Sequence, residues 1–274
     1  MLFRSQVQTT DQSLGGNDIV NAGNGDNTIL LGPGSDQLIS GNGADIVIGD
    51  NGIVVFENGG FASGDAVSIV STDLTDSTTG NDIISTGSGS DSIIAGGGSD
   101  TVNSGTGNDA VLGDHGTMTY TTSGVLTEID TTLVTLGSGD NITGGDGNNV
   151  ILAGSGGDIV DVGTGDSIVL GDQGTVTYTA TGLRIQATTT DVTSGADDKI
   201  NIAGGDNLVF GGASTNDPAS PINGDDITTG AGDDIIIGDF GQVDYDASGN
   251  LIQVQTTDLS YGGEDIVEIG RAHV

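Results

Sequence analysis

Residues 80–112 read GNDIISTGSGSDSIIAGGGSDTVNSGTGNDAVL, and this stretch repeats one pattern every nine residues. Asp82, Asp91, Asp100 and Asp109 hold the same place in successive repeats, each just after a Gly-x-Gly or Gly-Asn sequence. A short fixed period of this kind indicates that similar turns stack on one another. The stretch therefore predicts a solenoid whose turns present rows of carboxylates, and such rows need a cation.

The same pattern recurs before and after this stretch. The segment Ser40–Ile48 shows it well, with glycine at places two and four, Asp at place six and an aliphatic residue at place eight. Glycine permits positive φ angles and close backbone approach, as a tight turn requires. We expect six residues to form a turn and three to form a short strand, with the place-eight side chain pointing into the coil. These side chains are Leu38, Val47, Ile93, Val102, Ile151 and Val160.

The composition is acidic and poor in aromatic residues. Among 274 residues there are 51 Gly and 39 Asp+Glu against 4 Lys+Arg, which gives a net charge of -35. This charge argues against nucleic acid or an anionic membrane as a direct partner. The absence of Cys excludes disulfides and thiolate metal sites, and no apolar run is long enough to span a membrane. Residues 1–15 lack the pattern of a signal peptide.

A longer unit is superimposed on the nonapeptides. Each run of nonapeptides ends in Gly-Asp-x-Gly, and an aromatic residue follows four places after the last glycine. An alternating apolar stretch leads up to this aromatic residue, and a turn such as Ala247–Asn250 and a second alternating stretch follow it, which together predict a β-hairpin. A plain linker is the alternative, but the repeated aromatic position favours the hairpin. The aromatic residues are Phe56, Tyr120, Tyr178 and Tyr245.

These repeats divide the chain into similar units. We expect a partial hairpin at 1–17, full units at 18–81, 82–139, 140–197 and 198–264, and the start of a fifth unit at 265–267. The chain is therefore expected to be a piece of a longer array. Residues 268–274 fit no repeat and resemble a translated sequencing adapter, so we interpret them as a non-native tail.

The nonapeptide resembles the Gly-Gly-x-Gly-x-Asp-x-aliphatic-x repeat of RTX (hemolysin-type) calcium-binding proteins, of the long secreted or surface kind. The resemblance covers roughly half of the chain. It implies an all-β fold, namely parallel β-roll (β-solenoid) segments that alternate with β-hairpin insertions. It also implies that several Ca²⁺ ions are held between turns 18 residues apart.

Carried over place by place, the resemblance assigns carboxylate pairs to calcium. The best pairs are Asp18 with Asp36, Asp82 with Asp100, Asp91 with Asp109, and Asp140 with Asp158, while Asn27 with Asp45 lacks one charge. Asp225 and Asp234 resume the pattern in the fourth unit. The expected metal ligands are Asp18, Asn27, Asp36, Asp45, Asp82, Asp91, Asp100, Asp109, Asp140, Asp158, Asp225 and Asp234.

Two runs of nonapeptides depart from the pattern. Asn149 and Ser167 provide no carboxylate in the third, although Asp146 and Asp166 are nearby. In the fourth the pattern is interrupted, so we expect weak or absent calcium binding in both. The interrupting residues are Asn207, Asn216, Pro218 and Pro221.

The alternative reading of the Asp residues is that they cap turns by hydrogen bonds without a metal. The net charge argues against it, because aligned carboxylates repel one another. A Gly-rich, highly charged chain of low hydrophobicity also has the signature of disorder when no ion is bound. We therefore expect calcium binding to be coupled to folding.

Other motifs carry no comparable chemistry. The sequence Asp244-x-Asp246-x-Ser248-Gly249 begins like an EF-hand loop, but Gln255 stands where the Glu ligand belongs, so a hairpin turn is favoured. His115 is interpreted as a turn residue. No zinc-protease, serine-esterase or phosphate-binding motif occurs, so we expect no enzyme activity.

The predicted function is that of a calcium-binding structural segment of a large secreted or cell-surface bacterial protein, serving adhesion or extension. Its partners would be calcium and neighbouring repeats, and the resemblance implies export by a type I pathway. The alternative is an auxiliary domain that aids secretion and folding of a secreted hydrolase or pore-forming toxin. The parent gene would discriminate between the two, by many more units or by a catalytic domain.

Overall fold

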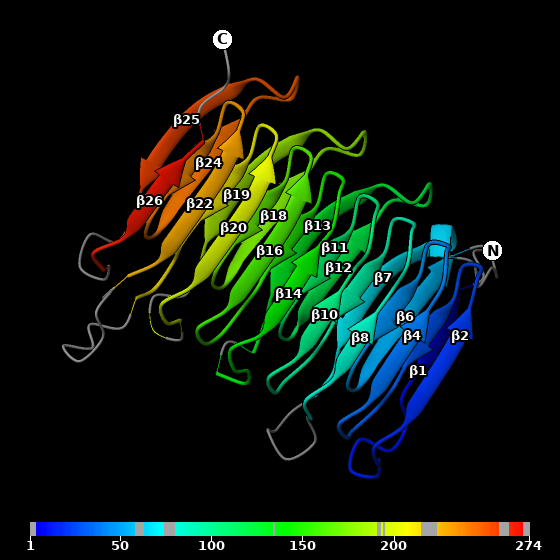
Figure 1. The fold of residues 1–274 in the computed structure, drawn as a ribbon. Helices are drawn as coiled ribbons and strands as arrows, with labels where there is room; N and C mark the ends of the chain where they lie inside the picture. Colours follow the sequence, from blue (N-terminus) through cyan, green and yellow to red (C-terminus); the bar gives the residue numbers. More distant parts are fainter. Residues whose placement is uncertain are drawn as a thin grey trace.

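A computed structural model describes residues 4–57, 63–73, 80–133, 135–190, 193, 195–214, 224–257 and 263–270. In this part of the chain the regular structure consists of β-strands and one short 3-10 turn, η1 (Ser63–Asp65). The strands stack side by side along one axis in the order of the sequence (Figure 1). They form three sheets, which we call the outer, middle and hairpin sheets.

The outer sheet is parallel and contains the first strand of each coil. Its strands, in spatial order, are β2 (Ile19–Gly23), β4 (Gln37–Ser40), β8 (Ile83–Ser85), β10 (Thr101–Asn103), β14 (Asn141–Gly144), β16 (Ile159–Thr164), β20 (Lys199–Gly204), β22 (Asp226–Ala231) and β26 (Ile266–Ile269). One face is buried and the other exposed, as in β10, where Val102 is buried between exposed Thr101 and Asn103.

The middle sheet is also parallel and contains the second strand of each coil. Its strands are β3 (Thr28–Leu30), β5 (Ile46–Ile48), β9 (Ser92–Ile94), β11 (Ala110–Leu112), β15 (Val150–Leu152), β17 (Ile168–Leu170), β21 (Leu208–Phe210) and β23 (Ile235–Ile237). Strands such as β5, β11 and β17 are buried at all three residues. This burial explains why they read as unbroken aliphatic runs, since both faces of the sheet are covered.

The hairpins form one antiparallel sheet that continues along the whole stack. Each hairpin pairs within itself, as β12 does with β13, and also with the next hairpin, as β13 does with β18. The strands are β1 (Arg4–Gln8), β6 (Gly52–Glu57), β7 (Ala66–Ser71), β12 (Gly116–Tyr120), β13 (Leu126–Thr131), β18 (Gly174–Tyr178), β19 (Arg184–Thr189), β24 (Gly241–Tyr245) and β25 (Leu251–Thr256).

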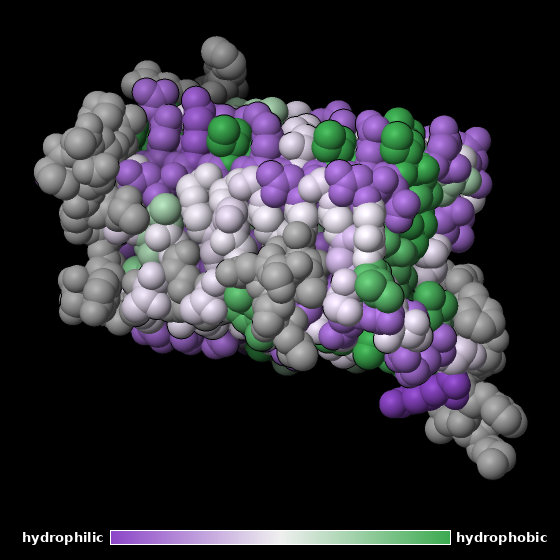
Figure 2. Space-filling view, turned by 90° about the horizontal axis from the view of Figure 1, so that it is seen from below, coloured by the Kyte–Doolittle hydropathy of each residue, from purple (hydrophilic) through white to green (hydrophobic). Residues whose placement is uncertain are grey.

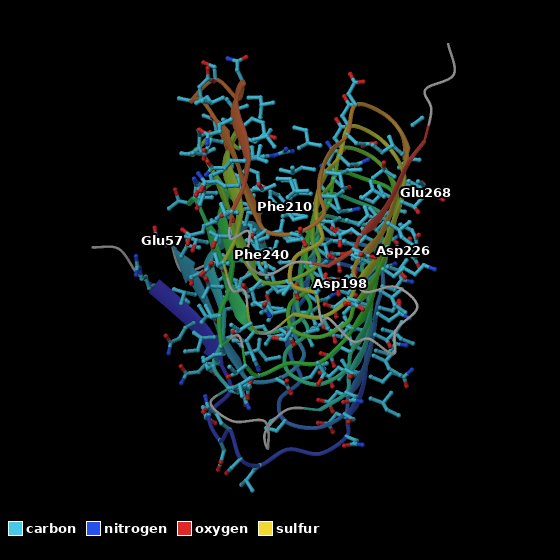
Figure 3. All side chains as sticks on the ribbon, turned by 90° about the vertical axis from the view of Figure 1, so that its left-hand side faces the viewer. Glu57, Asp198, Phe210, Asp226, Phe240 and Glu268 are labelled. Atoms are coloured by element: carbon cyan, nitrogen blue, oxygen red, sulfur yellow. The ribbon has the colours of Figure 1, made fainter. Side chains whose placement is uncertain are left out.

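Two thin cores lie between the three layers. Figure 3 looks along the stack and shows Phe240 just before β24 of the hairpin sheet, Phe210 on the middle sheet and Asp226 on the outer sheet. Between the outer and middle sheets lie the place-eight side chains, and all six predicted ones are at most 1 % exposed. The second core lies between the middle and hairpin sheets and includes Phe56, Met118 and Phe210.

The predicted all-β fold with parallel β-roll coils is therefore confirmed, and the hairpins are present. They are, however, more than insertions between rolls. The hairpin sheet covers the middle sheet and supplies one side of a core, so neighbouring units share all three sheets.

Two irregular regions keep the strand register. The fourth run of nonapeptides continues across the Pro-containing segment, because β22 pairs with β20 and β23 with β21. Asn216, Pro218 and Pro221 lie outside the described residues. At the other end, Glu268 and Ile269 continue β26 and pair with Thr228 and Thr229. Parallel pairing uses main-chain groups and needs no particular side chain.

Candidate metal-binding ladders

The place-six Asp residues that precede the outer-sheet strands form one continuous row, which we call ladder 1. In each step the Oδ1 atom of one Asp accepts a hydrogen bond from the backbone N–H of the preceding member. For example, Asp82 N–H donates to Asp100 over 2.7 Å, and Asp100 N–H donates to Asp140 over 2.7 Å. The members are Asp18, Asp36, Asp82, Asp100, Asp140, Asp158, Asp198, Asp225 and Asp265.

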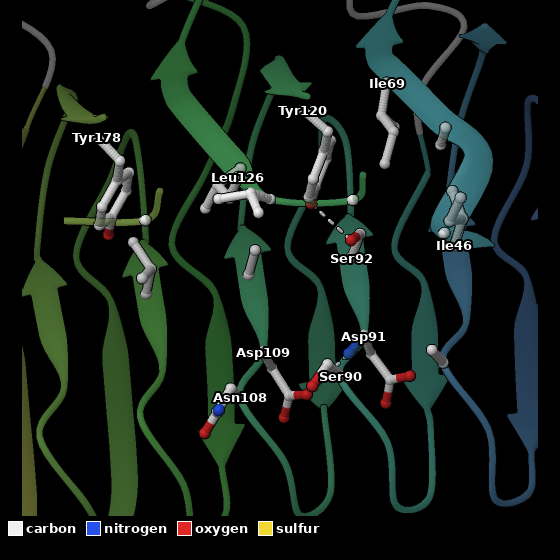
Figure 4. Close-up of a pocket in the computed structure, with 18 of the residues that line it drawn as sticks. Ile46, Ile69, Ser90, Asp91, Ser92, Asn108, Asp109, Tyr120, Leu126 and Tyr178 are labelled. Atoms are coloured by element: carbon white, nitrogen blue, oxygen red, sulfur yellow. Dashed lines mark hydrogen bonds between the residues drawn. The ribbon is translucent and has the colours of Figure 1, made fainter. Parts of the chain in front are cut away.

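A second row, ladder 2, precedes the middle-sheet strands. Asp91 N–H donates to Asp109 Oδ1 over 2.9 Å, and Figure 4 shows these two carboxylates side by side at the ends of neighbouring strands. The members are Asn27, Asp45, Asp91, Asp109, Asn149, Ser167, Asn207 and Asp234.

All twelve predicted ligand residues belong to these two ladders. The five predicted pairs are direct neighbours in them, each joined by a hydrogen bond of 2.6 to 2.9 Å. The structure adds neighbours that the spacing of 18 does not reveal, such as Asp36 and Asp82, which lie 46 residues apart. It also adds Asp198 and Asp265 to ladder 1. Their signal was already in the sequence, because both open a unit as Asp82 and Asp140 do.

The second carboxylate oxygen is what distinguishes these Asp residues from ordinary turn caps. In ladder 1, the Oδ2 atoms of Asp36, Asp82, Asp100, Asp140, Asp158, Asp198 and Asp225 are buried and have no hydrogen-bond partner in the protein. Turn capping therefore accounts for Oδ1 and leaves Oδ2 unexplained. A buried acceptor without a partner is costly, and a buried charge more so.

The burial raises the pKa of these carboxyl groups. Loss of solvation, together with the charge of Asp36, raises the pKa of Asp82 to about 7. For Asp100 and Asp140, burial and the charges of Asp140 and Asp114, respectively, raise the pKa to about 9. Burial raises the pKa of Asp91 in ladder 2 to about 6. Without a bound cation, folding at neutral pH would therefore require Asp100 and Asp140 to take up protons.

The Asn residues of ladder 2 show which groups lie opposite the second side-chain atom, which is Nδ2 in Asn and Oδ2 in Asp. Asn149 Nδ2 donates to the carbonyl oxygens of Gly144 and Gly145 over 3.1 Å each. Asn27 and Asn207 instead donate to the carbonyl two residues before them in the turn, Gly25 over 2.6 Å and Gly205 over 2.8 Å. Where Asp replaces Asn, an acceptor replaces this donor, so a carboxylate needs a cation or a proton between it and the turn carbonyls.

Protein cations do not fill this role in the described part of the chain. Arg4 pairs with Glu57 at 3.1 Å, Arg184 lies 5.1 Å from the centre of the Tyr245 ring, and Lys199 is exposed on the outer sheet. Nor do three acidic or histidine side chains gather there as a side-chain metal centre. A metal would take oxygen ligands from carboxylates and main-chain carbonyls together, which suits Ca²⁺.

Comparison with known families agrees with this donor set. A family model described as the RTX calcium-binding nonapeptide repeat (4 copies) matches residues 13–47, 76–111 and 135–169. The chain carries RTX calcium-binding repeats. RTX repeats are structural calcium-binding elements, so calcium binding follows from their presence. No curated protein matches the chain.

The fourth run of nonapeptides lies outside the matched residues but has the same geometry as the RTX repeats. Asp198 N–H donates to Asp225 over 2.8 Å, and Asn207 N–H donates to Asp234 over 3.0 Å. The residues of each pair are 27 positions apart instead of 18. The longer connection therefore breaks the 18-residue spacing by which the repeat is recognised in the sequence.

Two further residues of interest lie outside the ladders. Asp246 accepts hydrogen bonds from Ser248 N–H and Asn250 N–H over 2.8 and 2.9 Å within a hairpin turn. This agrees with the hairpin reading of the EF-like sequence. His115 is buried within its Gly-Asp-x-Gly turn.

In the described part of the chain, no helix has the length and apolar character needed to cross a membrane.

A pocket of about 390 Å³ lies between the hairpin sheet and the RTX turns of ladder 2 (Figure 4). Tyr120 reaches across it from β12 and makes a 2.7 Å hydrogen bond with Ser92 at the start of β9. Burial raises the pKa of Tyr120 to about 12. This bond ties the hairpin sheet to the roll.

Replacing Tyr120 by Phe is therefore expected to destabilise the calcium-bound chain by about 1 kcal/mol, the usual net value of a hydrogen bond. Tyr178 is the matched control, because it holds the equivalent place in the next hairpin but its hydroxyl has no partner in the protein. Tyr178→Phe should leave stability unchanged or slightly raised. Urea unfolding in saturating calcium measures both, and equal effects of the two variants would contradict the assignment.

Proposed function

We propose that the chain is a calcium-dependent structural segment of a larger secreted or cell-surface bacterial protein, with a role in extension or adhesion. The observation that carries the proposal is the set of buried Oδ2 atoms without partners in both ladders. At the equivalent place in ladder 2, Asn149 and Asn207 donate to turn carbonyls. Calcium between the carboxylates and these carbonyls would satisfy both. The assigned ligands are the carboxylates of the two ladders, with Asn27 as a neutral member.

Charge repulsion supports the coupling of calcium to folding. Carboxylates at the strand spacing of about 4.8 Å would repel by roughly 3 kcal/mol per neighbouring pair at an effective dielectric constant of about 20. Ladder 1 contains nine Asp residues in one row. The chain would therefore stay disordered at cytosolic calcium and fold at the near-millimolar calcium outside the cell.

A role in extension is supported by the continuity of the sheets. Nine stacked strands in the outer sheet span about 40 Å, and no unit is closed off from the next. Most of the face in Figure 2 is polar, while apolar surface gathers at the right-hand end, near the N-terminal strands. At the ends of the stack Leu14, Ile19, Ile252 and Ile269 are 58 to 82 % exposed. These faces suit contact with neighbouring repeats.

The alternative role, aiding secretion and folding of a hydrolase or toxin, requires the same calcium chemistry. It predicts a catalytic or pore-forming domain in the parent gene, whereas an extension role predicts many more hairpin-linked units. Type I export is proposed in both cases.

Calcium binding by ladder 1 is testable with Asp100→Asn. This nearly isosteric change keeps the acceptor for Asp82 N–H but removes a charged ligand, so calorimetric titration should show fewer ions bound and weaker binding. Asp161→Asn is the matched control, because Asp161 is exposed on β16 and contacts Asn201 at 2.8 Å. Identical titrations for the two variants would refute the role of Asp100 as a ligand.

A further inference from the structure

The chain leaves the roll for the hairpin sheet at equivalent turns, which we call seams. Each seam has the sequence Gly-Asp-x-Gly, and its Asp belongs to neither ladder. Asp50, Asp114 and Asp172 are at most 3 % exposed, although an aspartate at a turn is usually at the surface.

At the first seam the charge of Asp82 acts on the buried carboxyl group of Asp50. Asp50 Oδ2 accepts a 2.8 Å hydrogen bond from Gly97 N–H, but its Oδ1 atom has no hydrogen-bond partner in the protein. A methyl group on Gly49 would lie 2.4 Å from Asp82 Oδ2 and 2.1 Å from the carbonyl oxygen of Ala95. Asp82 Oδ2 also has no partner. Two acceptor oxygens, Asp82 Oδ2 and the Ala95 carbonyl, thus lie close to Gly49, the residue before Asp50.

The second seam repeats this arrangement. A methyl group on Gly113 would lie 2.4 Å from Asp140 Oδ2 and 2.2 Å from the carbonyl oxygen of Ala153. Asp114 Oδ2 accepts the N–H of Ser155, in the place that Gly97 holds at the first seam. Asp140 Oδ2 is buried without a partner.

The third seam has the same constituents. A methyl group on Gly171 would lie 2.1 Å from Asp198 Oδ2 and 2.4 Å from the carbonyl oxygen of Gly211, and Asp172 Oδ2 accepts the N–H of Ala213. Figure 3 shows Asp198 in the interior, between the outer and hairpin layers. The glycine at the start of each motif is therefore required by the close approach of oxygen atoms.

We propose that the seams form a second row of Ca²⁺ sites, each built from the seam Asp, the ladder 1 Asp that opens the next unit, and a main-chain carbonyl. The pairs are Asp50 with Asp82, Asp114 with Asp140, and Asp172 with Asp198. These sites lie where each hairpin begins, so calcium would fix the hairpin sheet to the roll as well as one coil to the next.

The oxygen atoms that would bind the metal at a seam are those that Ca²⁺ prefers. They are carboxylate and carbonyl oxygens, with no nitrogen or sulfur among the ligands. Protonated Asp side chains acting only as turn acceptors are the competing explanation, and the two differ in the number of ions bound.

The proposal rests on calcium binding by the ladders, which is the proposed function. The test distinguishes a failure of the seam sites from a failure of calcium binding by the ladders. Asp114→Asn keeps the acceptor for Ser155 N–H and removes the charge, and Asp161→Asn removes the same charge from an exposed place. Calcium per chain is measured by elemental analysis after equilibrium dialysis, with the β-sheet signal recorded in parallel. Asp114→Asn should bind one ion fewer than both the wild-type chain and Asp161→Asn.

Equal calcium content in Asp114→Asn and the wild-type chain would overturn the seam site. A wild-type chain that binds no calcium would overturn the proposed function instead. Because the first seam is equivalent, Asp50→Asn repeats the measurement if Asp114→Asn does not fold. A deficit of one ion in Asp50→Asn supports the proposal in the same way, and no deficit contradicts it.

Discussion

In calcium-free buffer the β-sheet signal of this chain is expected to be strong near about pH 5 and to be lost as the pH rises to about 9. Burial raises the pKa of Asp82 to about 7, of Asp225 to about 8, and of Asp50 and Asp100 to about 9, from an ordinary value of 3.8. In the unfolded chain these groups ionise near their ordinary pKa. Their protonation therefore stabilises the folded state fully below about pH 4, and this contribution disappears as the pH passes through the raised values.

Calcium should reverse this dependence. The metal binds the ionised carboxylates, so raising the pH removes the competing protons and strengthens binding. With saturating calcium the signal should persist at about pH 9, the condition under which the calcium-free chain unfolds. Circular dichroism in EGTA and then in excess calcium, at each pH, measures both effects. The chain's pI of about 4.1 makes about pH 5 the lower practical limit.

An unchanged β signal in EGTA from about pH 5 to 9 would contradict the assignment of the ladders as buried and unpaired. Asp100→Asn gives an internal check, because it removes one of the groups that must hold a proton. In EGTA this variant should keep its structure to a higher pH than the wild-type chain, although it binds calcium less well.

Gly107→Ala is expected to destabilise the calcium-bound chain by about 2–4 kcal/mol, because it combines overpacking with backbone strain. Gly107 has φ of 150°, and a methyl group there would lie 1.4 Å from the carbonyl oxygen of Gly89 in the coil beneath. The neighbouring turns would have to separate, which would also disturb the carbonyls that face ladder 2.

Gly16→Ala is the matched control, since a methyl group on Gly16 would meet nothing within 4 Å. Its effect on stability should be small. Urea unfolding in saturating calcium gives both free energies of unfolding. Similar values for the two variants would show that the turns are not stacked as closely as described.

The repeat pattern was sufficient to predict the coils, their inward-facing aliphatic residues and the five neighbouring pairs within the ladders. This was possible because those features depend on residues close in sequence. Val102 and Asp100 follow from a single nonapeptide, and Asp82 with Asp100 from two consecutive ones.

Contacts between distant segments could not be predicted in the same way. Asp36 and Asp82 are 46 residues apart, and a hairpin of variable length separates them in the sequence. Only the parallel pairing of β4 with β8 places them together. Likewise, Asp50 reads as a residue of a repeated turn until the fold brings it beside the coil that contains Gly97.

The sequence by itself determined the period, the side chains that face the coil and the excess of carboxylates over cations, since each is a property of local order or composition. Tertiary structure alone decided that the hairpins join into one sheet, that the ladders run unbroken through all units and that the seam carboxylates are buried. These features arise from packing between segments many residues apart, and packing also determines which oxygen atoms are cut off from water and therefore need a cation.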